Sequence, residues 1–286
     1  MHTLELKNGD RLAYRDQGSG PVMVLVHGWG VSGELFDDQL LALSDRFRVV
    51  IPDLPGHGAS SEFHHQAEFS SLADAVAELL RHLQLESVCL VGWSLGAMVC
   101  WDLLARHPEL TISGLITIDM VPRLLNDNSW RYGLREGSDS HAFDRDIEII
   151  LSDWHAYADL LAPRWLGQGA GDALPDLLAR VKGAAQTNQP ASMARIWKLL
   201  VEQDFCSALA RMTLPTLVIT GGQSSLYDVP AGEWIVEQMP AAKLEVFQNS
   251  GHAPHLDQPQ RFNQLLAEFT LNLNDNTAGI DGTLMS

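Results

Sequence analysis

The sequence predicts an α/β fold with a mostly parallel, doubly wound sheet and a helical cap inserted into it. Several short segments are apolar at every position, as in strands that helices cover on both faces of a parallel sheet. Helical patterns alternate with these segments, except over residues 122–212, where patterns rich in Trp and Tyr run without a recognisable strand. We therefore expect a sheet core of residues 1–121 and 213–273, a cap over 122–212, and an irregular tail over 274–286.

Composition narrows the class of protein. The chain has 286 residues, 46% of them hydrophobic, which is enough for one large domain, and no continuous membrane-spanning run. The net charge of −17 argues against nucleic-acid and anionic-membrane partners, because both bind cationic surfaces. The three cysteines are expected to be reduced, and the first residues lack the features of a signal peptide, so we expect a cytoplasmic protein.

The expected core elements begin with a hairpin. Leu4 to Leu6 and Leu12 to Tyr14 flank a turn signal at residues 8–10, which predicts antiparallel pairing at a sheet edge. Apolar runs then predict strands over residues 22–26, 49–51, 88–91, 112–118, 217–219 and 244–247. Apolar residues at helical spacing predict helices over 72–83, 95–106 and 265–269.

A serine between two glycines stands where one of these strands gives way to a helix. The pentapeptide G-W-S-L-G at 92–96 has the pattern of a nucleophile elbow, in which the central residue takes a strained backbone conformation. Glycines are needed beside it, because a Cβ would strike the neighbouring strand or helix. Ser94 is therefore the candidate nucleophile.

Two further segments are expected at the same edge of the sheet. The turn H-G-W-G at 27–30 follows a buried strand, and its Trp29 N–H and the Leu95 N–H are candidate donors to a tetrahedral oxyanion. His27 is expected to hold this loop by hydrogen bonds. His252, which precedes the last helix, is the candidate base for Ser94 and is favoured over His255.

These motifs, together with P-D-L-P-G-H-G-A-S at 52–60 and G-H-A-P-H at 251–255, occur in the order found in the α/β-hydrolase superfamily. The chain resembles the serine-nucleophile, esterase-like branch of that superfamily over almost its whole length. The resemblance implies Ser94 as nucleophile, His252 as base, Trp29 and Leu95 as oxyanion donors, and Asp53 as a structural loop residue. Haloalkane dehalogenases carry aspartate at the elbow, so the serine disfavours that activity.

The third member of the implied triad departs from the family pattern. The acid usually follows the strand at 217–222 as Gly-x-x-Asp, but here the position is occupied by Ser225. Two carboxylates can replace it. Asp119 follows the strand at 112–118, a position that some superfamily members use, and it is favoured over Asp228. A loop cap for Asp119 and a helix N-cap for Asp228 are the structural alternatives.

The expected cap is rich in aromatic residues, which suggests an apolar pocket for a neutral, hydrophobic acyl or aryl substrate. We expect Trp93, Trp130, Trp154 and Trp165 to line it, although such residues also form a cap's own core. The histidines at 64–65 and at 252 and 255 have no third ligand at suitable spacing, so we expect no metal and no cofactor.

A serine hydrolase that cleaves an ester, lactone or thioester through an acyl-enzyme on Ser94 is the leading hypothesis. Carbon–carbon bond hydrolysis is an alternative within the same fold. A cofactor-independent oxygenase or perhydrolase, and a ligand-binding receptor, are alternatives from other classes. The residues do not identify the substrate or the oligomeric state.

Overall fold

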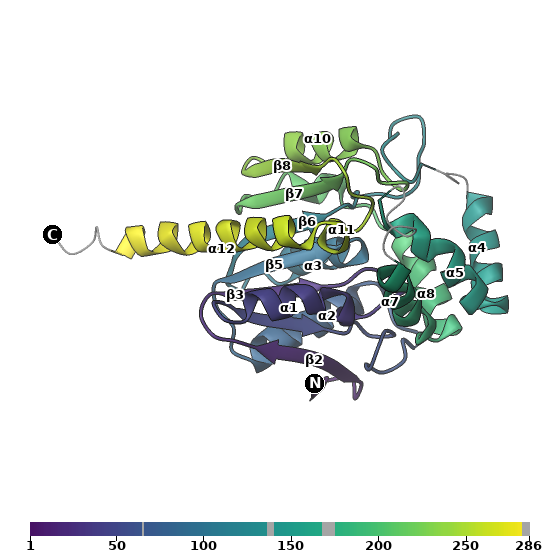
Figure 1. Ribbon diagram of the computed structural model, residues 1–286, viewed down its shortest axis with the longest axis horizontal. Helices are drawn as coiled ribbons and strands as arrows, with labels where there is room; N and C mark the ends of the chain where they lie inside the picture. Colours follow the sequence, from purple (N-terminus) through teal and green to yellow (C-terminus); the bar gives the residue numbers. More distant parts are fainter. Residues whose placement is uncertain (65, 136–139, 168–174, 282–286) are drawn as a thin grey trace.

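One eight-stranded sheet forms the centre of the protein. The computed structural model describes residues 1–64, 66–135, 140–167 and 175–281 (Figure 1). The strand order is β1-β2-β4-β3-β5-β6-β7-β8; β1 pairs with β2 and β2 with β4 in antiparallel fashion, and the other pairs are parallel. The strands are β1 (His2–Glu5), β2 (Arg11–Gln17), β3 (Val22–Val26), β4 (Arg48–Pro52), β5 (Val88–Trp93), β6 (Ile112–Ile118), β7 (Thr216–Gly221) and β8 (Ala242–Phe247). The predicted mostly parallel, doubly wound sheet with an edge hairpin is confirmed.

Helices lie on both faces of this sheet. The helices of the sheet core are η1 (Gly33–Phe36), α1 (Asp37–Leu43), α2 (Ser70–His82), α3 (Leu95–Arg106), α10 (Val229–Gln238), α11 (Pro254–Asp257) and α12 (Pro259–Asp281). α1 packs against α12, and α2 packs against α3. The chain moves from β3 to β4 in one direction and from β4 to β5 in the other, so right-handed crossovers place α1 and α2 on opposite faces.

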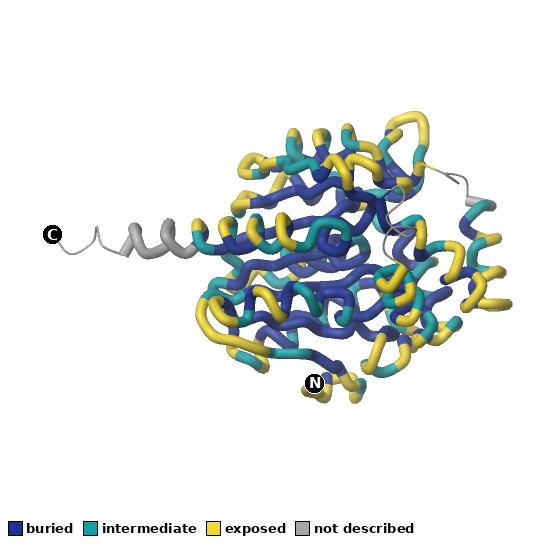
Figure 2. The backbone as a smooth tube through the Cα atoms, in the orientation of Figure 1, coloured by how far each residue is buried: buried dark blue, intermediate teal, exposed yellow. Residues whose placement is uncertain are grey.

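Burial from both sides explains the uniformly apolar strands. The side chains from Met23 to Val26 in β3 are fully buried, as are those from Val88 to Val91 in β5. Figure 2 shows these strands as the buried centre of the molecule, with exposed residues on the outer turns of the helices. Alternating polar positions would place polar groups under a helix, where they have no water to bind.

Helices fill the block that lies between β6 and β7 in the sequence. They are α4 (Ser140–Ser152), α5 (Trp154–Trp165), α7 (Pro175–Gln186), α8 (Pro190–Val201) and the short α9 (Cys206–Leu209). α4 packs against α8 and α5 against α7, and these four helices gather at one end of the sheet (Figure 1). An isolated bridge pairs Arg123 with Asp204, so the segment leaving β6 lies beside the segment that returns to β7.

The C-terminal segment differs from its expected irregular form. α12 continues to Asp281, through most of the segment 274–286, and residues 282–286 lie outside the described residues. Once a helix has formed, each added residue gains one hydrogen bond, and no proline follows Pro259 to stop the helix. Helical continuation therefore needs no apolar periodicity in this segment.

All three cysteines are free thiols, and Cys89 and Cys100 are buried in the core. Burial raises the pKa of the Cys89 thiol to about 12, which keeps it in the unreactive protonated form. No helix in the described part of the chain is both long enough and apolar enough to cross a membrane.

Candidate active site

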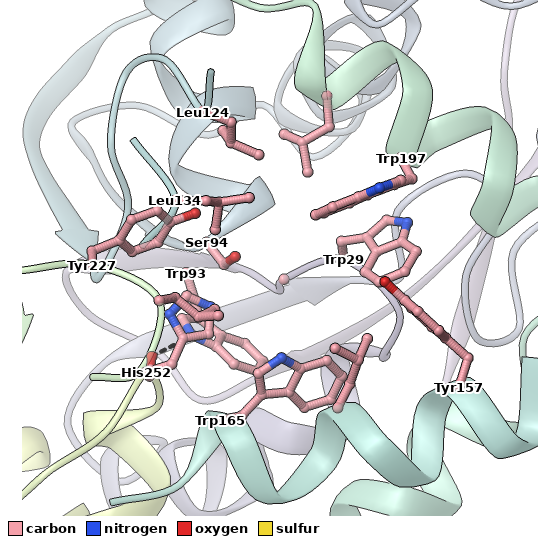
Figure 3. A pocket seen from close by; sticks show the side chains of 14 residues that line it. Trp29, Trp93, Ser94, Leu124, Leu134, Tyr157, Trp165, Trp197, Tyr227 and His252 are labelled. Carbon is pink, nitrogen blue, oxygen red and sulfur yellow. Dashed lines mark hydrogen bonds between the residues drawn. The ribbon is translucent and has the colours of Figure 1, made fainter. Parts of the chain in front are cut away.

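Ser94 occupies a sharp turn between β5 and α3. Its φ of 53° and ψ of −120° lie outside the ordinary regions for a residue with a side chain. A Cβ on Gly92 would lie 2.5 Å from the Gly96 carbonyl oxygen, and one on Gly96 would lie 2.1 Å from the Val26 carbonyl oxygen. Both predicted glycine requirements are confirmed, and the turn exposes the Ser94 hydroxyl to a pocket (Figure 3).

A buried carboxylate holds the imidazole that lies beside this serine. His252 Nδ1 is 2.8 Å from Asp119 Oδ2, and both side chains are almost completely buried. A proton on Nδ1 that is donated to this carboxylate leaves Nε2 as the basic nitrogen. Ser94 and His252 both line the pocket (Figure 3), although no hydrogen bond joins their side chains within the described structure. Such bonds often form only when substrate is bound.

The two candidate acids lie in different environments. Asp119 directly follows β6, with a φ of 43°, and its backbone N–H donates to the Ile219 carbonyl oxygen at 2.7 Å. Asp228 precedes α10 at the surface, where its half-exposed carboxylate lies 3.2 Å from Arg135 Nη1. The structure therefore brings Asp119, and not Asp228, to His252.

The loop at 27–30 is held by two buried histidines. His27 Nε2 accepts the Leu54 N–H at 2.9 Å, and His57 Nε2 accepts the Gly30 N–H at 3.2 Å. Burial lowers the pKa of both imidazoles, so each ring stays neutral and keeps a nitrogen that accepts a hydrogen bond. The predicted structural role of His27 is thus consistent with its contacts.

Asp53 stabilises the neighbouring turn. Its carboxylate accepts the Gly33 N–H and the Ala59 N–H, each at 2.9 Å. Both oxygens are occupied by these backbone donors, so the carboxylate fixes a loop and lies apart from the pocket lining.

Two backbone donors near Ser94 are unused. Within the described residues, the N–H groups of Trp29 and Leu95 have no acceptor, and Leu95 begins α3. The first N–H groups of a helix point out of its N-terminal end, roughly along the axis, without an internal partner, and the helix dipole favours negative charge there. These two donors are available to an anion that forms beside Ser94.

The pocket beside Ser94 is largely apolar. The pocket and the open solvent at its mouth together comprise about 530 Å³, and none of the described residues lining it is Asp, Glu, Lys or Arg. In Figure 3, Trp29, Tyr157 and Trp197 lie on one side of Ser94, and Leu134 and Tyr227 lie on the other. The lining residues are Gly28, Trp29, Trp93, Ser94, Leu124, Leu134, Tyr157, Leu161, Trp165, Trp197, Leu200, Leu226, Tyr227 and His252.

Two of the four tryptophans predicted to line the pocket do so, namely Trp93 and Trp165. The prediction is wrong for the other two. Trp154 packs behind Trp29, with ring centroids 5.4 Å apart, and its indole N–H donates to the Ala185 carbonyl. Trp130 packs edge-on against Trp234 and donates to the Arg123 carbonyl. Each indole N–H is satisfied by a backbone carbonyl, so these rings form the interior of the cap and its base.

Several pocket residues carried no signal in the sequence. Tyr227, for example, lies in a loop without a motif. The lining leucines come from loops and helices far apart along the chain, and each has the same apolar character as a core leucine. Only their spatial arrangement distinguishes them.

The loop after β7 holds a further residue that the sequence did not identify. Ser224 is buried, and its hydroxyl donates to Asp119 Oδ2 at 2.6 Å. Ser225, which occupies the usual acid position, is exposed and donates to the Arg164 carbonyl.

The histidine pairs show no metal-binding arrangement in the part of the chain that the structure describes. No group of three His, Cys, Asp or Glu side chains there has the geometry to hold a metal ion. His64 lies 2.9 Å from Asp10, and His65 falls outside the described residues. His255 packs its ring against Trp93, with centroids 4.6 Å apart.

The sheet topology, the elbow serine and the buried His–Asp pair define the class as an α/β hydrolase with a serine at its elbow. The model of the alpha/beta hydrolase family matches residues 23–265, and the chain belongs to this family. It is an enzyme of the hydrolase type.

Its relatives include pimeloyl-(acyl-carrier protein) methyl ester esterases. The one from Chromobacterium violaceum is 32% identical over 255 residues, covering 88% of this chain and 94% of the relative. The one from Vibrio vulnificus is 28% identical, covering 90% and 97%. Among solved structures, an esterase from Exiguobacterium antarcticum superposes with a TM-score of 0.87 at 22% identity, covering 94% of this chain and 98% of that one. An esterase from Thermogutta terrifontis has a TM-score of 0.84 at 25% identity, with coverage of 95% and 98%.

Proposed function

We propose that the protein is a serine esterase that cleaves a small, neutral ester with an apolar acyl or aryl group. The observation that carries the proposal is the 2.8 Å contact between His252 and Asp119 in the wall of the pocket that holds Ser94. A lactone or thioester has the same electrophilic carbonyl and is a related substrate class.

In the first half of the reaction, Ser94 Oγ attacks the ester carbonyl carbon while His252 Nε2 takes the hydroxyl proton. Asp119 stabilises the resulting imidazolium, and the N–H groups of Trp29 and Leu95 bind the oxyanion. Collapse of this intermediate breaks the bond to the alcohol oxygen, which receives the proton from His252. The products of this half are a free alcohol and an acyl group esterified to Ser94.

In the second half, water replaces the alcohol. His252 takes a proton from the water, whose oxygen attacks the acyl carbon, and the same N–H groups bind the second oxyanion. The bond to Ser94 Oγ then breaks, and His252 returns the proton to Ser94. The carboxylic acid product leaves, so one ester and one water yield one acid and one alcohol.

The pocket lining supports a neutral substrate. A charged group in this pocket would lose its hydration without gaining an ionic partner among the described lining residues. Flat aromatic walls at Trp29 and Trp197, whose ring centroids are 4.8 Å apart, offer apolar contact area instead.

The named substrate of the relatives refines this proposal. Those proteins are named for the hydrolysis of a methyl ester on a pimeloyl group attached to acyl-carrier protein. A methyl ester is neutral and apolar, so it suits the pocket, and we propose methyl and other short-alkyl esters as the substrate class.

The test compares wild type with Ser94→Ala on p-nitrophenyl esters of two to ten carbons and on pimeloyl-(acyl-carrier protein) methyl ester. We expect ester turnover that Ser94→Ala abolishes, with Asp228→Asn as the active control. If the protein hydrolyses the p-nitrophenyl esters but not the carrier-bound ester, the assignment as an esterase stands and the carrier-bound ester is rejected as its substrate. No ester turnover by folded wild type would overturn the proposal and favour carbon–carbon cleavage, oxygenase chemistry or ligand binding.

We also propose a cytoplasmic location and a small hydrophobic substrate molecule as the partner of the site. The three free thiols support the location, since a reducing compartment keeps cysteines unpaired. Fractionation of the native host, with the protein found outside the cytoplasm, would reject it.

A further inference from the structure

The Asp119 carboxylate is held by donors from a second loop. Its Oδ1 accepts the Gly221 N–H at 2.9 Å, and its Oδ2 accepts the Ser224 hydroxyl at 2.6 Å, in addition to its contact with His252. These donors come from the end of β7 and the loop that follows it, whereas Asp119 itself follows β6. The plane of the carboxylate is therefore set by groups outside its own segment.

The Ser224 hydroxyl has only one direction in which to donate. Its oxygen accepts the Leu226 N–H at 3.2 Å and the Tyr227 N–H at 3.3 Å. A hydroxyl has two acceptor lone pairs and one proton, so the two N–H groups occupy the acceptor side and direct the proton to Asp119. Ser224 is 2% exposed, which keeps water from competing for these bonds.

The same hydroxyl connects the carboxylate to the pocket wall. The side chains of Leu226 and Tyr227 line the pocket, and their backbone N–H groups end on Ser224 Oγ. Ser225 makes a useful contrast, because this adjacent serine is exposed and its hydroxyl donates to the Arg164 carbonyl.

We propose that Ser224 is a positioning residue of the active site, which orients the Asp119 carboxylate towards His252. The inference rests on the proposed function, in which Asp119 is the acid of the triad. Ser224 contacts neither Ser94 nor the reacting atoms; it acts through Asp119.

The test measures kcat, KM and the pH profile of p-nitrophenyl butyrate hydrolysis for wild type, Ser224→Ala and Ser225→Ala, with active sites counted by titration. We expect Ser224→Ala to lower kcat by about tenfold to a hundredfold, the scale of a misplaced catalytic group. Loss of the hydroxyl concentrates negative charge on Asp119 Oδ2 and favours protonated His252, so the acidic limb of the profile moves to higher pH. Ser225→Ala retains the wild-type profile.

A role in fold stability alone predicts a different result. Ser224→Ala would then lower the melting temperature and the count of active sites, while kcat per active site and the acidic limb would match wild type, and the proposal would be overturned. If Ser224→Ala does not fold, Ser224→Cys supplies a weak donor of similar size. We expect a lowered kcat for it, and a wild-type kcat would equally reject the proposal.

Two further variants separate this inference from the proposed function. Ser224→Ala added to Asp119→Asn should lower kcat no further, because the carboxylate through which Ser224 acts is already absent. If Ser224→Ala lowered kcat in the Asp119→Asn background as much as it does in wild type, the positioning role would be overturned. Asp119→Asn with near-wild-type kcat would overturn both the acid assignment and this inference. Loss of activity in Asp119→Asn with no effect of Ser224→Ala would overturn the inference alone.

Discussion

The indole N–H of Trp93 donates to the main-chain carbonyl of His252 at 2.8 Å. The residue immediately before the elbow serine thereby fixes the loop that carries the imidazole, although 159 positions separate the two partners in the sequence. Trp93 also lies with its ring centroid 5.6 Å from that of His252. One side chain thus links the two segments that carry Ser94 and His252.

Trp93→Phe keeps most of the apolar ring and removes this hydrogen bond. We expect kcat to fall by about tenfold and the free energy of unfolding to fall by about 1–3 kcal/mol, because a buried carbonyl loses its donor. Trp130→Phe is the matched control, since it removes an indole bond to the Arg123 carbonyl away from the pocket. It should lower stability and leave kcat unchanged. Equal effects of both variants on kcat would contradict the role of Trp93.

Gly96→Ala tests the close approach behind the elbow. The added Cβ would lie 2.1 Å from the Val26 carbonyl oxygen, so we expect a loss of more than about 2 kcal/mol of stability, or no folded protein. Gly183→Ala is the control, because Gly183 lies inside α7 and, apart from the adjoining helix backbone, no described heavy atom lies within 4 Å of the added Cβ. It should raise stability by about 0.4–1 kcal/mol. Urea unfolding of both variants provides the measurement.

Trp197 is expected to limit the length of the acyl group. It lines the pocket beside Trp29, so Trp197→Leu should open space and raise the ratio of kcat/KM for octanoyl over acetyl esters by about tenfold or more. Trp234→Leu, which lies outside the pocket lining, should leave the ratio unchanged. A ratio unaffected by Trp197→Leu would place the acyl chain against another wall.

Buried neutral histidines predict a loss of stability in mild acid. Neither ring nitrogen of His255 has a hydrogen-bond partner in the described structure, and burial holds its pKa well below the ordinary value. In the unfolded chain this imidazole binds a proton near pH 6.5, whereas in the folded protein it stays neutral at that pH. The stability that is present above that pH is therefore lost as the pH falls. One such histidine changes the free energy of unfolding by at most about 1.4 kcal/mol per pH unit.

His255→Leu should therefore flatten the fall in melting temperature between pH 7 and pH 5. His27 and His57, whose pKa values are also lowered by burial, remain and retain part of the slope. His82, which is exposed and has no ion pair in the described structure, provides the control through His82→Gln, which should leave the slope as in wild type. An unchanged slope in His255→Leu would show that this imidazole already takes up its proton in the folded state.

The sequence pattern alone could not decide which carboxylate is the acid of the triad. Asp119 and Asp228 both follow predicted strands near the same sheet edge, so local pattern alone left the two alternatives open. The choice depends on the paths of the two loops. Asp119 is held at the strand end by its N–H bond to Ile219, whereas Asp228 lies seven residues beyond Gly221, at the start of α10.

The sequence by itself determined the sheet, its edge hairpin, the helical block between the β6 and β7 segments, and the elbow around Ser94. These features depend on local rules: uniform apolarity for a strand buried on both faces, and glycine where no Cβ fits. Tertiary structure alone decided that Asp119 and Ser224 meet beside His252, and that leucines rather than Trp130 and Trp154 complete the pocket. The physical reason is that a buried side chain has the same sequence signature whether it faces a core or a cavity. Only the packing of distant segments determines which of the two it faces.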